Sequence, residues 1–60
     1  MQISEITQYA RALYHAHGDR AEYEATRRMN AADQSGRSKR AEDWRRIRMT
    51  IRELRGPRIN

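Results

Sequence analysis

Apolar side chains recur at helical spacing along most of this sequence, and this periodicity favours an all-α fold. If each residue advances by about 100°, as in an α-helix, the apolar positions of the first half stay within about 60° of one line. These positions are Ile3, Ile6, Ala10, Leu13, Tyr14, His17, Ala21, Ala25 and Ala32. One Pro and three Gly among 60 residues are too few for the turns that a β architecture requires.

The apolar stripe keeps its phase for about thirty residues, which favours one long helix over about 4–34 with Ser4 as its N-cap. Gly18 is the position at which this helix either bends or ends. If it ends there, the chain forms a three-helix mini-bundle instead. We favour a continuous helix, because two independent helices have no reason to share a phase and an internal Gly costs only about 1 kcal/mol.

Turn residues cluster beyond the first helix and predict a loop over about 35–38. A shorter, basic helix over about 39–55 follows, capped by Ser38 and ended by Gly56-Pro57. Residues 56–60 are expected to form a loose tail. The chain over 1–60 is therefore predicted to be a single small helical domain, a hairpin of unequal helices.

The two predicted helices differ in length. At 1.5 Å per residue the first spans about 45 Å and the second about 25 Å, so the second covers only the later half of the first. The hairpin core is expected to comprise Ala21, Ala25, Trp44, Ile47, Ile51 and Leu54. Nothing in the chain then covers the early part of the stripe, and an exposed apolar surface usually marks an interface. The predicted partner-binding residues are Ile3, Ile6, Ala10, Leu13 and Tyr14.

The net charge of +5 is divided unevenly along the chain. Residues 1–36 carry a net charge of −1, whereas residues 37–60 carry +6, which indicates an acidic or polyanionic partner for the second helix. The predicted basic surface consists of Arg37, Arg40, Arg45, Arg46, Arg52 and Arg58. Part of this charge is expected to be neutralised within the helix, by pairs from Glu42 to Arg45 and Arg46 and from Asp43 to Arg46.

Residues that carry chemistry are scarce. Cys is absent, which excludes disulfides and thiolate metal sites. His15 and His17 lie about 200° apart on a helix and cannot chelate one metal ion, so we expect neither a metal nor another cofactor. The sequence has no catalytic motif, and we expect no enzyme activity. It shows neither a membrane-spanning segment nor a signal peptide, which predicts a cytoplasmic protein.

The segment His17–Ala25 resembles the inter-helix segment of a tetratricopeptide repeat. The likeness covers nine of the 60 residues. Arg11 and Arg27 stand where that family has small or aromatic residues, so no family function is carried over to this chain.

These patterns predict a non-catalytic interaction or assembly protein, either a homo-oligomer or an accessory subunit of a larger complex. It would dock through the N-terminal apolar stripe and present its basic helix to an acidic protein surface. The alternative is a nucleic-acid-binding protein that contacts phosphates through the arginines of the second helix. Trp44 is the one aromatic residue in the basic segment, and its place on the apolar side favours a core role over base stacking.

Overall fold

Helices account for almost all of the chain that the computed structural model describes, residues 2–56. The elements are α1 (Ile3–His17), a 3-10 turn η1 (Gly18–Arg20), α2 (Ala21–Gln34) and α3 (Ser38–Arg55). No strand occurs among residues 2–56, so the predicted all-helical class is confirmed. None of these helices has both the length and the apolar character needed to cross a membrane.

The helices begin slightly earlier than predicted. The N-cap of α1 is Gln2, and its backbone N–H donates a hydrogen bond of 3.1 Å to Oε1 of Glu5. Ser4 therefore lies in the first turn and does not cap the helix. The N-cap of α3 is Arg37, and Ser38 is the first helical residue.

The continuous helix predicted over about 4–34 is interrupted at Gly18, and that prediction is corrected. Gly18 adopts φ 60° and ψ −130°, a conformation open to glycine but strained for L-residues. One 3-10 turn follows, and α2 begins at Ala21 in a new direction. A straight helix over 4–34 would be about 45 Å long, whereas the longest dimension of the molecule is 36 Å.

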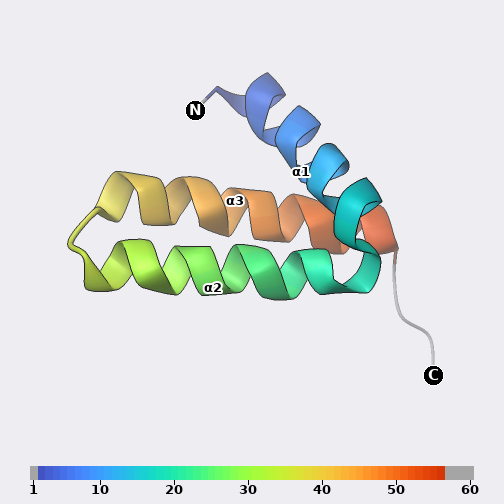
Figure 1. Cartoon of the computed structure of the whole chain (residues 1–60). Coiled ribbons are helices and arrows are strands. Elements are labelled where there is room, and N and C mark those ends of the chain that lie inside the picture. The colour runs from blue at the N-terminus through green and yellow to red at the C-terminus, as the bar shows by residue number, and fades with distance from the viewer. Residues whose placement is uncertain (1, 57–60) are drawn as a thin grey trace.

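The helices α2 and α3 form the predicted helical hairpin and run side by side in opposite directions (Figure 1). The helix α1 crosses α3 at an angle. It joins the N-terminal end of α2, which lies beside the C-terminal end of α3. Gly56 follows α3 with φ 83°. Pro57, Arg58 and the rest of the predicted tail lie outside the described residues.

One buried cluster joins all the α-helices. Its members are Ile6, Ala10, Ala21, Ala25, Ile47 and Ile51, with Leu13, Tyr14 and Trp44 packed against it and partly buried. The alanines let the helix backbones approach closely, while Ile47 and Ile51 are the largest fully buried side chains. Leu54 is half-buried near the end of α3.

The expectation that nothing in the chain covers the N-terminal stripe is wrong. Ile6 and Ala10 are buried, because the turn at Gly18 places α1 against α3. Leu13 and Tyr14 pack on the same core. Ile3, at 71% exposure, is the member of the predicted partner-binding set that remains largely in solvent.

Candidate anion-binding site

The structure separates the predicted basic surface into distinct places. Arg37 and Arg40 line a hollow beside Trp44, at the loop end of the hairpin. Arg45 and Arg46 line a second hollow with Ile3 and Met49. Arg52, a further member of the predicted surface, lines neither hollow. Arg52 is bound to Glu22, and Arg58 lies outside the described residues.

Arg52 and Arg55 bind a carboxylate at the other end of the hairpin. Nε and Nη2 of Arg52 donate to Oε2 of Glu22 at 3.0 and 2.8 Å, and Nη1 of Arg55 donates to Oε1 at 2.6 Å. Glu22 lies in the first turn of α2 and both arginines in the last turn of α3, so each charge also complements its helix dipole. These contacts fasten the two helices together and engage Arg52 within the chain.

The hydrogen bond from Arg52 is the main cause that lowers the pKa of the Glu22 carboxyl below its ordinary value, and Arg55 adds to it. Burial of the carboxyl acts in the opposite direction. Because the pKa is lower in the folded chain than in the unfolded chain, folding is favoured when Glu22 is ionised. This contribution is complete above the ordinary glutamate pKa of about 4.3 and is lost as the pH falls below it.

Glu22→Gln is expected to lower the free energy of unfolding at neutral pH by about 1–2 kcal/mol. Hydrogen bonds to charged groups contribute about 1.5–3 kcal/mol, and the value here is set lower because the Arg52 side chain is 60% exposed and solvent screens the pair. Urea unfolding followed by circular dichroism measures the loss. The variant should also lose less stability than the parent chain when the pH is lowered from about 6 to about 3, because these values lie on either side of the ordinary glutamate pKa.

Glu53→Gln is the matched control, because Glu53 is exposed on α3 and has no ion pair within residues 2–56. The control should unfold with nearly the parent stability and the parent pH dependence. Equal effects of the two substitutions would contradict a specific role for the Glu22 contacts.

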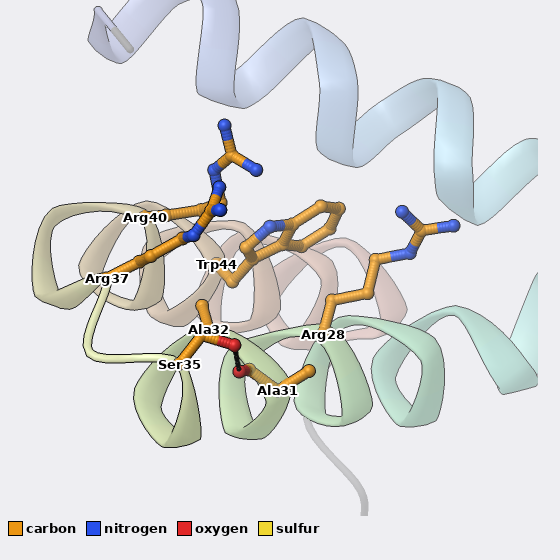
Figure 2. Close-up of a pocket in the computed structure, with 7 residues that line it drawn as sticks. All are labelled: Arg28, Ala31, Ala32, Ser35, Arg37, Arg40 and Trp44. Carbon is orange, nitrogen blue, oxygen red and sulfur yellow. Dashed lines mark hydrogen bonds between the residues drawn. The ribbon is translucent and has the colours of Figure 1, made fainter.

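The hollow beside Trp44 has a volume of about 250 Å³. Figure 2 shows the indole with the guanidinium groups of Arg37 and Arg40 on one side and that of Arg28 on the other. The remaining lining comes from small residues of α2 and its C-cap, Ala31, Ala32 and Ser35. Ser35 donates its hydroxyl hydrogen to the carbonyl oxygen of Ala31 at 2.9 Å. The wall therefore combines cationic donors, one aromatic surface and a floor of small side chains.

Trp44 is half-buried and is held by side chains from the other two α-helices. The ring of Tyr9 in α1 meets it edge to face, with centroids 5.5 Å apart and an interplanar angle of 88°. The guanidinium carbon of Arg28 in α2 lies 5.4 Å from the indole centroid. The contact with Tyr9 fixes the indole, while Arg28 makes a cation–π contact that is weak where solvent has access.

The charge in this hollow is not balanced by its own lining. Its three arginines face no lining carboxylate, whereas a neighbouring hollow at the loop end combines Lys39 and Arg45 with Asp33 and Glu42. Within residues 2–56, Arg37 and Arg40 have no ion pair, and Arg28 has one contact of 3.6 Å to Glu24. The lining of the hollow beside Trp44 therefore carries a net positive charge, while Arg37 and Arg40 also line an adjoining hollow that includes Lys39 and Asp43.

The pairs predicted from Glu42 to Arg45 and Arg46 do not form among the described residues. Arg45 and Arg46 are exposed on α3. Their guanidinium groups, like those of Arg37 and Arg40, remain available to an external anion.

Two side chains of this site were not predicted from the sequence, namely Tyr9 and Arg28. A signal for Arg28 was present, since it lies three residues after Ala25 and four before Ala32 and so shares their apolar face. A charged residue on an apolar face indicates either that its charge has a partner within the fold or that it serves in binding a ligand. Tyr9 has no comparable signal, because its contact with Trp44 depends on the turn at Gly18.

No group of three His, Asp or Glu side chains within residues 2–56 is arranged to hold a metal ion. The chain matches no protein-family model, and neither the curated proteins nor the solved structures provide a match.

Proposed function

We propose that this chain is a small helical protein that binds nucleic acid through phosphate contacts from its arginines. The observation that carries the proposal is the set of exposed guanidinium groups on and next to α3 without carboxylate partners in the described chain. This set comprises Arg37, Arg40, Arg45 and Arg46.

The chemistry of these groups favours phosphate as the ligand. Twelve of the thirteen basic residues are Arg and one is Lys. A guanidinium group presents a planar fork of N–H donors that matches phosphate oxygens in a bidentate contact. Phosphate contacts of this kind supply most of the affinity in sequence-independent nucleic-acid binding.

Docking onto a protein through the N-terminal stripe has less support, since most of that stripe packs inside the chain. The exposed apolar remainder between α1 and α3 consists mainly of Ile3 and Met49, at 71% and 55% exposure. Protein interfaces depend on a few large anchors, often Trp, Tyr or Arg, that become fully desolvated. Trp44, the largest aromatic, instead lies among arginines in the other hollow.

A salt titration of binding to a labelled oligonucleotide tests the proposal. Each phosphate contact to a single strand contributes about −0.7 to the slope of log affinity against log salt, so four contacts give a slope of roughly −3. The affinity should then fall roughly fiftyfold between about 50 and 200 mM salt. Fluorescence anisotropy measures both quantities.

Paired variants identify the contacts. The double variants Arg37→Gln with Arg40→Gln, and Arg45→Gln with Arg46→Gln, should each make the slope shallower by about 1.4. Arg11→Gln with Arg20→Gln is the control of equal charge change, because both residues are exposed and lie outside this set. If all three double variants lost the same affinity, the effect would be due to net charge alone and the assigned contacts would be wrong. Absence of binding at low salt would refute the proposal.

A further inference from the structure

We infer that the hollow beside Trp44 is a stacking subsite for an unpaired nucleobase, with Arg37 and Arg40 holding the adjoining phosphates. The inference rests on the proposed nucleic-acid function and narrows it to single strands, of DNA or RNA. It follows from the juxtaposition of one indole with three arginines, which come from both helices of the hairpin and the loop between them.

The geometry of the indole suits a stacking platform. Aromatic side chains interleaved with cations are the usual means of binding single strands without sequence preference, because every base has a π-face. Tyr9 meets Trp44 edge to face and holds it from α1. This contact keeps the ring in place while its outer part stays accessible, since Trp44 is only half-buried.

Arg28 covers the indole in the free protein with a contact that is easily exchanged. Its side chain is 56% exposed, and the nearest carboxylate oxygen of Glu24 lies 3.6 Å away. An exposed pair of this kind contributes little stability. A base can therefore displace the guanidinium group of Arg28 from the indole ring, and this group can then bind a phosphate.

Arg37 and Arg40 supply the phosphate contacts at the other edge of the ring (Figure 2). Both side chains are exposed, and neither has an ion pair within residues 2–56. The small side chains Ala31 and Ala32 form the floor between them and Arg28, and the volume is about 250 Å³. A double helix holds its bases paired and stacked on each other, so this subsite favours a strand with bases free to turn outward.

An abasic oligonucleotide provides the sharpest test, because it keeps the phosphates and removes only the bases. The unmodified protein is titrated at low salt with labelled oligothymidine, oligouridine and an abasic strand of equal length. Stacking of one base should make both base-bearing strands bind roughly fivefold to a hundredfold more tightly than the abasic strand. A duplex of the same length should bind more weakly per phosphate than the single strands.

The fluorescence of Trp44 is a second readout, since it is the one Trp in the sequence. Base-bearing strands should change its intensity at saturation, and the abasic strand should leave it nearly unchanged. Equal affinity for all strands, with no base-dependent change in fluorescence, would overturn the stacking subsite and leave phosphate binding intact. Failure of every strand and of the duplex to bind would overturn the proposed function and, with it, this inference.

Discussion

Ile6→Ala is expected to lower the free energy of unfolding by about 2–5 kcal/mol, the usual range for truncating a buried isoleucine. Ile6 is 4% exposed in the cluster that joins α1 to the hairpin. A chain this small has little stability in reserve, so the loss is severe. Urea unfolding followed by far-ultraviolet circular dichroism and by Trp44 fluorescence measures it.

Ile3→Ala is the matched control, because Ile3 lies in the first turn of the same helix and is 71% exposed. It should change stability by less than about 0.5 kcal/mol. If Ile6→Ala leaves too little folded protein, Ile6→Val removes one methylene and should cost about 0.5–1.5 kcal/mol, again against Ile3→Val. Small and equal effects at both positions would show that α1 does not pack on α3.

The hairpin could be predicted from the sequence because local signals specify it. Helical spacing of apolar side chains predicts the second helix, at Trp44, Ile47, Ile51 and Leu54. The turn residues around Gly36 predict the loop that precedes it. These signals need no knowledge of distant contacts. The bounds of α3, Ser38–Arg55, agree with the predicted range to one residue.

The direction of α1 could not be predicted in this way. The stripe through Ile6 and Ala10 continues in phase through Ala21 and Ala25, which a single straight helix would explain. In the structure both parts face a common partner, α3, so they share a phase although a turn separates them. A shared phase therefore does not distinguish one helix from two that pack on the same neighbour.

For the same reason, only part of the candidate site could be predicted from the sequence. Arg37 and Arg40 belong to the predicted basic surface, because charge density along the chain is visible in sequence. The place of Trp44 at the edge of the core depends on where α1 crosses α3, and so does its contact with Tyr9. Sequence periodicity assigns a residue to a face and says nothing of whether the face is fully covered.

Gly18→Ala is expected to lower the free energy of unfolding by about 1–3 kcal/mol, although an alanine usually stabilises a helix. Gly18 has φ 60° and ψ −130°, where an L-residue is strained even though nothing lies within 4 Å of the added Cβ. The substitution also favours a continuous helix over about 4–34, which would carry Ile6 away from α3. Urea unfolding measures the loss, and small-angle scattering should show a larger maximum dimension and radius of gyration for the variant than for the parent chain.

D-Alanine at the same position is the matched control, introduced by chemical synthesis of the chain. Its conformational preferences are the mirror image of those of L-alanine, so φ 60° and ψ −130° become favourable for it. The D-alanine chain should keep the parent dimensions and at least the parent stability, because it also restricts the unfolded state. If L-alanine instead raised the stability and D-alanine lowered it, Gly18 would lie within a continuous helix, and both the core around Ile6 and the contact of Tyr9 with Trp44 would have to be abandoned.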